Sequence, residues 1–208
     1  MQASCKYGFI QMINFINKNN KLNETKNSLV ITYPRTVNII FGNYPYPEKI
    51  HNFIVEIKNN LSEKMEGYTN VKGGMTDWNY FINKSSFADF MSYVINKHQI
   101  SHPNIFEHFF EKYRIREAWG NEIKTNGSVE YHIHQFMHGI LYLTKGSDLN
   151  LPELNVKITP EPGDYYILPP HIFHGFEKHT EKNNRYSLIF NIQNGEEFEY
   201  NKKLQKIK

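Results

Sequence analysis

The spacing of apolar residues divides the chain into two parts. In three segments between residues 48 and 113 apolar side chains recur every three or four positions, which is the spacing of one face of a helix. Three helices are predicted there: Glu48–Met65, which follows Pro47 and ends before Gly67; a second capped by Ser85 or Ser86; and a third from Pro103 to Tyr113. Upstream, we expect a short helix near Tyr7–Lys18 and a strand over Thr36–Asn43.

From about Ile115 onward the segments are short and β-like, and turn signals such as Asn126-Gly127 and Pro162-Gly163 separate them. Several short strands at regular spacing are typical of a β-sandwich or barrel. We therefore expect one domain over residues 1–208, with an α+β portion at 1–117 bracing a β core at 118–198. The predicted strands of that core are Ala118–Lys124, Glu130–Gln135, Gly139–Thr144, Asn155–Thr159, Tyr165–Leu168, Gly175–Lys178 and Arg185–Ile192.

Composition limits the function classes. Of the 208 residues, 39% are hydrophobic and 15% are aromatic, which suits a β-rich globular protein and argues against disorder. The formal net charge is only +3 and most lysines are scattered, so no nucleic-acid-binding stripe is evident. A single cysteine excludes an intramolecular disulfide. We see neither a signal peptide nor a membrane span, and we expect a cytoplasmic protein that interacts with no membrane, with a homodimer left open.

Three histidines in the β core form a candidate metal site. His132 and His134 lie two residues apart on a predicted strand, so their side chains share a face. His174, after Pro169-Pro170, can complete the site from another strand. Neutral imidazole is the commonest metal ligand and suits iron, zinc, copper and nickel. His138 and His171 are alternative ligands, and the other five histidines are interpreted as surface residues: His51, His98, His102, His108 and His179.

Arg185 and Ser187 form a candidate carboxylate clamp beside that metal. They share one face of a predicted apolar strand, and the planar guanidinium fits a carboxylate through two hydrogen bonds. A surface arginine at a strand start is the alternative interpretation. Position favours the clamp, because the arginine begins an apolar strand that is expected inside the barrel.

These features resemble the 2-oxoglutarate/Fe(II)-dependent oxygenase superfamily, in particular its small bacterial and phage-type group with a His-x-His motif. The resemblance covers about the last two fifths of the chain, and Arg185-x-Ser187 is its most specific part. It implies a double-stranded β-helix, or jelly roll, with Fe(II) held by His132, His134 and His174. It also implies 2-oxoglutarate as co-substrate, bound by Arg185 and Ser187, and hydroxylation of an unidentified small molecule or side chain. The residues that carry it are Trp119-Gly-Asn121, His132-x-His134, His138-Gly-Ile-Leu-Tyr-Leu143, Pro162-Gly163-Asp164, Leu168-Pro169, His174-Gly175 and Arg185-Tyr-Ser-Leu-Ile-Phe-Asn191.

Three further groups are candidates around the site. Tyr142 is expected to hydrogen-bond 2-oxoglutarate or, equally, to be an aromatic core residue. Trp119 and Asn121 are candidates for the pocket wall, with Trp119 favoured as a core residue. The segment from Gly73 to Trp78 could contribute to a lid.

One residue departs from the superfamily pattern. His134 stands where the usual motif has aspartate or glutamate, so the site could hold three histidines, take another metal, or use Glu130 or His138 as its third ligand. The same histidines also resemble the two cupin motifs, which would give a metal-dependent dioxygenase, isomerase or small-ligand binding protein without 2-oxoglutarate. Arg185-x-Ser187 discriminates between these classes, because a cupin has no general use for the clamp. A jelly roll without catalytic activity is the third class, and failure to bind metal would favour it.

Overall fold

The computed structural model describes residues 23–25, 28–30, 37–63 and 69–199, so the helix predicted near Tyr7–Lys18 lies outside the described residues. The chain divides into two compact units, residues 1–39 and residues 40–208. In the first unit, β1 (Asn23–Thr25) and β2 (Ser28–Val30) pair as an antiparallel hairpin.

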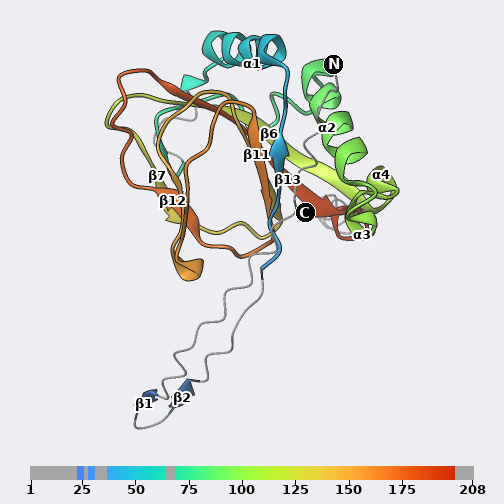
Figure 1. The fold of residues 1–208 in the computed structure, drawn as a ribbon, viewed down its shortest axis with the longest axis vertical. Coiled ribbons are helices and arrows are strands. Elements are labelled where there is room, and N and C mark those ends of the chain that lie inside the picture. The colour runs from blue at the N-terminus through green and yellow to red at the C-terminus, as the bar shows by residue number, and fades with distance from the viewer. Residues whose placement is uncertain (1–22, 26–27, 31–36, 64–68, 200–208) are drawn as a thin grey trace, which may run out of the picture. The chain divides into compact units, whose positions relative to one another are not determined.

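Two antiparallel sheets form the second unit (Figure 1). The six-stranded sheet has the order β3 (Ile40–Asn43), β11 (Asp164–Leu168), β8 (Met137–Tyr142), β13 (Arg185–Asn194), β6 (Tyr113–Ile123) and β5 (Gly74–Met75). The five-stranded sheet has the order β10 (Val156–Ile158), β9 (Leu149–Leu151), β12 (His174–Phe176), β7 (Ser128–His132) and β4 (Val71–Lys72), and a short 3₁₀ helix, Pro152–Leu154, joins β9 to β10. This arrangement is a jelly roll with flanking helices, and the predicted fold class is confirmed.

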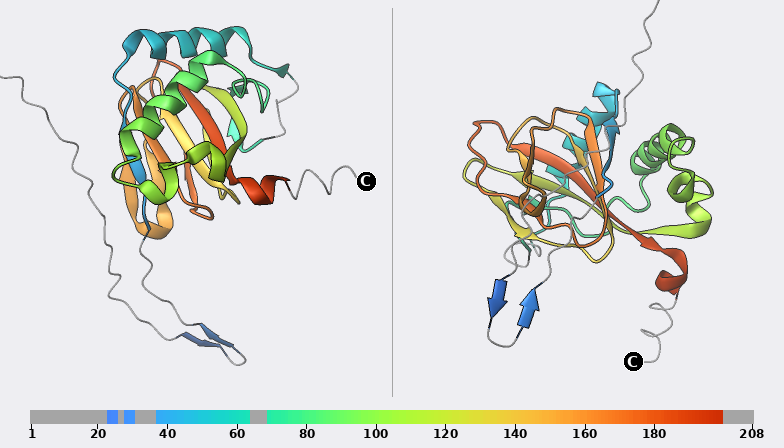
Figure 2. Two further views of the ribbon diagram at one scale, coloured as in Figure 1. Left: turned by 90° about the vertical axis from the view of Figure 1, so that its right-hand side faces the viewer. Right: turned by 60° about the horizontal axis from the view of Figure 1, so that its bottom comes forward.

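The helices cover the outer face of the six-stranded sheet, away from β7 and β12 (Figures 1 and 2). They are α1 (Pro47–Asn59), α2 (Ser85–His98), α3 (Pro103–Phe106) and α4 (Phe109–Lys112). Phe53 and Ile57 of α1 pack in one apolar core with Phe87 and Phe90 of α2 and with alternate residues of β13, Leu188, Phe190 and Ile192. Because strand side chains alternate between faces, the intervening residues of β13 point to the inside of the jelly roll. None of the helices in the described part of the chain is both long and apolar enough to span a membrane.

The helices differ from the predicted ones at their ends. The first ends at Asn59, because the chain then pairs with β5: the Ser62 backbone N–H donates to the Met75 carbonyl at 2.7 Å. The predicted serine cap of the second helix is wrong: Lys84 holds the cap position, and the Ser86 hydroxyl donates instead to Glu56 on α1, at 3.3 Å.

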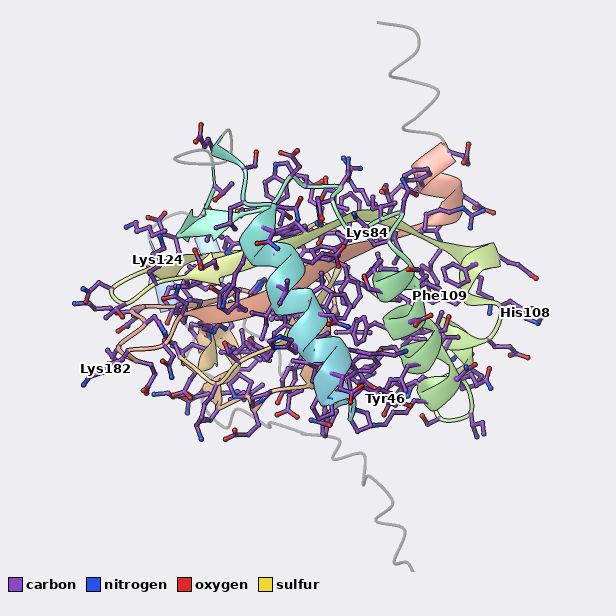
Figure 3. The ribbon with its side chains drawn as sticks, turned by 90° about the horizontal axis from the view of Figure 1, so that it is seen from above. Tyr46, Lys84, His108, Phe109, Lys124 and Lys182 are labelled. Atoms are coloured by element: carbon purple, nitrogen blue, oxygen red, sulfur yellow. The ribbon has the colours of Figure 1, made fainter. Side chains whose placement is uncertain are left out.

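The third predicted helix is two short ones. His108, labelled in Figure 3, separates α3 from α4 because its backbone is left-handed, with a φ of 54°. Strand β6 then begins at Tyr113, close to the predicted change of periodicity. The predicted strand from Thr36 begins at Ile40, and the predicted strand Glu130–Gln135 ends at His132. The short strands β4, β5 and β9 were not predicted, because two or three residues carry too little periodicity.

Two histidines interpreted as surface residues are buried, so that interpretation was wrong for them. His98 follows Val94 by one helical turn on the apolar face of α2, and its Nε2 lies 2.7 Å from the Tyr165 hydroxyl. His179 is fully buried in a loop between the Ser147 hydroxyl and the Asn183 carbonyl. The partner of His98 lies far away in the sequence, and His179 bonds to Asn183 within an irregular loop. The spacing of residues in the sequence therefore did not indicate that either histidine is buried.

Candidate metal centre

The three motif histidines meet at the inside of the five-stranded sheet. His132 ends β7 and His174 begins β12, and the two residues are direct partners across this antiparallel pair. His134 lies just after β7, where its carbonyl accepts a hydrogen bond from the His171 backbone N–H at 2.8 Å. Each of the three offers one ring nitrogen, and these atoms lie within 4.8 Å of one another. The strand register thus brings three imidazoles to one point.

Two of these histidines have their tautomer set by the backbone. His132 Nδ1 lies 2.7 Å from the carbonyl of Glu130, and His174 Nδ1 lies 2.9 Å from the carbonyl of Ile172. A ring nitrogen that faces a carbonyl must donate, so the lone pair of each neutral ring is on Nε2. The Nε2 atoms of His132 and His134 are 2.9 Å apart, and the buried Nε2 of His174 has no hydrogen-bond partner in the described chain. His132 Nε2, the unprotonated nitrogen of its ring, accepts a hydrogen bond from His134 Nε2 in the metal-free protein. Once His134 Nε2 has lost this proton, the three Nε2 atoms form a set that fits a divalent cation.

Burial keeps these imidazoles neutral. Desolvation lowers the pKa of His132, and it is the main cause that lowers the pKa of His134 to about 3 and that of His174 to about 4. The neighbouring imidazoles lower the pKa values of His134 and His174 further. A neutral imidazole is the form that binds a metal, so these histidines need no deprotonation before binding.

Arg185 lies in the same cavity as the histidines. Its side chain is only 4% exposed, and its guanidinium carbon lies 4.1 Å from the ring centre of Phe176 and 4.9 Å from that of Tyr142. Burial lowers the pKa of Arg185, and no acidic side chain of the described residues forms an ion pair with it. Ser187, on the same face of β13, is buried and also lines the cavity. A buried guanidinium without a carboxylate is costly unless a ligand supplies one.

Unpaired polar atoms concentrate around this cavity. In the described part of the chain, seven buried side-chain nitrogen and oxygen atoms lack a hydrogen-bond partner, and five of them belong to residues that line it. Buried polar groups in proteins are nearly always paired, so such a concentration marks a place for a polar ligand. The five atoms are Trp119 Nε1, Asn121 Oδ1, the Tyr142 hydroxyl, His174 Nε2 and Arg185 Nε.

Solved structures with this architecture exist, although no protein-family model and no curated protein matches the chain. A Pseudomonas putida prolyl-4-hydroxylase is 12% identical, with a TM-score of 0.54 over 76% of this chain and 93% of the other. HygX from Streptomyces hygroscopicus, with nickel and 2-oxoglutarate bound, is 11% identical, with a TM-score of 0.53 over 76% of this chain and 83% of the other. The viral collagen prolyl hydroxylase of Paramecium Bursaria Chlorella virus-1, in its 2-oxoglutarate complex, is 12% identical, with a TM-score of 0.52 over 74% and 94%.

The chain has the fold of the 2-oxoglutarate/Fe(II)-dependent oxygenases. Within this fold, the alternative ligands named above take other positions. The Glu130 carboxylate pairs with Lys72 at 3.0 Å near the surface, and only its backbone carbonyl contacts a motif histidine. His171 is exposed. His138 lines the cavity but is not one of the three residues whose ring nitrogens converge.

The other predicted pocket residues of this oxygenase-like fold line the cavity. Trp119, Asn121 and Tyr142 all do so, and burial raises the pKa of Tyr142 to about 12, which keeps its hydroxyl a donor. Of the suggested lid, Met75 and Trp78 contribute to the wall. The contact of Phe176 with Arg185 was missed, although Phe176 follows His174 by two residues and therefore shares its strand face.

Proposed function

We propose that this protein is a 2-oxoglutarate- and Fe(II)-dependent oxygenase that hydroxylates a small molecule or a side chain. One observation carries the proposal: a buried guanidinium, without a carboxylate partner among the described residues, shares a cavity with three imidazoles whose ring nitrogens converge. The fold shared with 2-oxoglutarate-binding structures supports it.

His132, His134 and His174 would hold the metal, and their neutral rings suit iron. Arg185 and Ser187 would bind the distal carboxylate of 2-oxoglutarate, with a hydrogen bond from the Tyr142 hydroxyl. The aromatic rings of Phe176 and Tyr142 both contact the guanidinium and restrict its orientation before the ligand arrives.

A bound metal and 2-oxoglutarate would supply the chemistry of O₂ reduction coupled to decarboxylation, which would yield succinate, CO₂ and a hydroxylated substrate. The protein's own residues bind, orient and exclude water. Ile140, Leu149 and Ile189 line the cavity between its polar groups, and this apolar wall limits access of water to the site.

Metal and co-substrate binding test the proposal separately. Ni(II) or Co(II) is titrated into metal-free protein by calorimetry, and 2-oxoglutarate is then titrated into the loaded protein. We expect both to bind and His174→Ala to lose at least tenfold in metal affinity, whereas His51→Ala, an exposed histidine on α1, is unchanged. In the presence of Fe(II) and O₂, activity is measured as the release of succinate.

The same titrations separate the alternatives. Metal binding without any 2-oxoglutarate binding would refute the oxygenase proposal and favour a cupin-type function. Absence of metal binding would refute both and favour a jelly roll used only for interaction. Arg185 is the observation that favours the oxygenase over these, because neither alternative needs a buried guanidinium in the metal cavity.

A further inference from the structure

The three converging histidines are not held in the same way. His132 and His174 each donate Nδ1–H to the carbonyl of the residue two positions earlier. No hydrogen bond to Nδ1 of His134 is found among the described residues, and His134 lies beyond the end of β7. The ring plane of His134 therefore needs another restraint if it is to present Nε2 to a metal.

His138 provides that restraint by stacking. The ring centres of His134 and His138 are 3.6 Å apart, and the two planes differ by only 15°. His138 comes from β8 and is 3% exposed, so the stacked pair is formed between a loop residue and a buried strand residue. No other described aromatic contact of His134 is as close: its centre lies 4.8 Å from that of His132 and 5.3 Å from that of His174.

The ring of His138 is itself held by a chain of hydrogen bonds across the six-stranded sheet. His138 Nδ1 lies 3.0 Å from Asn191 Oδ1, and Asn191 Nδ2 donates to Glu117 Oε2 at 2.7 Å. The three residues are direct register partners on adjacent strands β8, β13 and β6. Because direct partners place their side chains on the same face, the register itself lines up this chain. The amide of Asn191 donates to Glu117, so its oxygen must accept from His138 Nδ1–H.

We propose that His138 is a positioning residue that orients the metal ligand His134 through ring stacking, with its own ring fixed by Asn191 and Glu117. The inference rests on the metal site of the proposed function. It concerns the ligand position at which this chain has an imidazole in place of a carboxylate. The ring plane of an imidazole must be oriented so that its nitrogen points at the metal, and a face-to-face contact restrains that plane. His138 does not itself contribute a ligand atom in this arrangement.

Co(II) affinity and the Co(II) absorption spectrum test the proposal without turnover. We expect His138→Ala to weaken Co(II) binding about tenfold and to alter the spectrum, as loss of an outer-shell partner does. His138→Phe keeps a stacking ring and should retain most of the affinity. Asn191→Ala frees the ring of His138 and should give an intermediate loss. His51→Ala is the matched control and should bind like the wild type.

A second background separates positioning from a general structural role. In His134→Asp the stack is absent, so adding His138→Ala should change Co(II) affinity by less than about twofold. An equal loss in both backgrounds would make His138 a direct ligand or a purely structural residue and would overturn the proposal. So would a wild-type affinity and spectrum in His138→Ala. If His138→Ala does not fold, His138→Phe with wild-type affinity supports the proposal, and a tenfold loss there overturns it.

The failure of this inference is distinguishable from failure of the metal site. If His134→Ala and His174→Ala leave Co(II) binding unchanged, the metal site itself is wrong. If those variants lose affinity and the His138 variants do not, the metal site stands and the stacking proposal alone is refuted.

Discussion

Replacing Arg185 by methionine should stabilise the protein and abolish its response to 2-oxoglutarate. Arg185 is 4% exposed, and its guanidinium has no carboxylate partner among the described residues. Methionine is of similar length and apolar, so it can contact the rings of Phe176 and Tyr142 without leaving a buried charge. A residue kept for ligand binding at a cost in stability is the expected signature of a functional site.

The expected change in the free energy of unfolding results from two opposing contributions. An unpaired buried ion costs several kcal/mol, roughly 4 here. Two cation–π contacts offset about 1 kcal/mol each, which leaves about 2 kcal/mol in favour of Arg185→Met. For a protein of this size, 1 kcal/mol corresponds to about 2–4 °C in Tm. The metal- and ligand-free variant should therefore melt about 4–8 °C above the wild type.

In the presence of ligand, the wild type should be the more stable of the two proteins. With Ni(II) present and 2-oxoglutarate at about 100 times its Kd, mass action stabilises the wild type by about 2.7 kcal/mol, or roughly 5–11 °C, and leaves the variant unchanged. Calorimetric melting of both proteins, with and without ligand, measures the four values, and Arg114→Met is the control because Arg114 does not line the cavity. An Arg185→Met protein that is less stable than the ligand-free wild type would refute the reasoning, because the guanidinium would then already be satisfied.

Two further substitutions test the buried polar groups. Tyr142→Phe removes a hydroxyl that has no partner in the described chain, so stability should be unchanged, whereas 2-oxoglutarate should bind roughly 10–100-fold more weakly, as expected for one hydrogen bond to a charged group worth about 1.5–3 kcal/mol; calorimetric titration measures this. Burial, with smaller contributions from His102 and Lys97, lowers the pKa of His98 to about 4. The unfolded chain takes up a proton at this residue as the pH falls below about 6.5 and the folded chain does not, so stability is full above pH 6.5 and declines towards pH 4. His98→Gln should remove up to about 3 kcal/mol of that decline, measured by urea unfolding at pH 7 and pH 4.5, and a decline as steep as in the wild type would contradict the assignment.

Local periodicity was sufficient for the parts of the site that lie on one strand or close to it. His132 with His134, and Arg185 with Ser187, are pairs at a spacing of two, and the structure brings each pair to one cavity. The spacing argument was incomplete for His134, because β7 ends at His132 and a backbone hydrogen bond from His171 holds the next segment. The loop that contains His171 thus holds His134 beyond the end of the strand, and no pattern in the sequence indicates this contact.

Contacts that depend on sheet register were beyond the sequence. The chain from His138 through Asn191 to Glu117 joins residues 53 and 74 positions apart, and it exists only because β8, β13 and β6 pair in one register. The failed helix prediction after Pro103 has a local cause instead: a left-handed residue, His108, breaks a stretch whose apolar spacing is helical. Spacing reports which face a residue prefers, but not whether its backbone stays regular.

The charge of the cavity would link metal binding to 2-oxoglutarate binding if the proposed function holds. None of the described residues that line the cavity is acidic, and its three converging imidazoles are neutral. A bound dication and the Arg185 guanidinium would therefore share the cavity without a protein carboxylate to offset their charges. In this poorly solvated space their repulsion would lower the affinity for the metal. A dicarboxylate that contacts both the metal and the Arg185 guanidinium would offset the charge of each. Binding of metal and of 2-oxoglutarate should then reinforce each other to the same degree, since coupling between two binding sites is reciprocal. A carboxylate at position 134 would weaken this coupling, because it would itself offset part of the metal charge. With a histidine there, a bound dicarboxylate would be the main source of negative charge at the site.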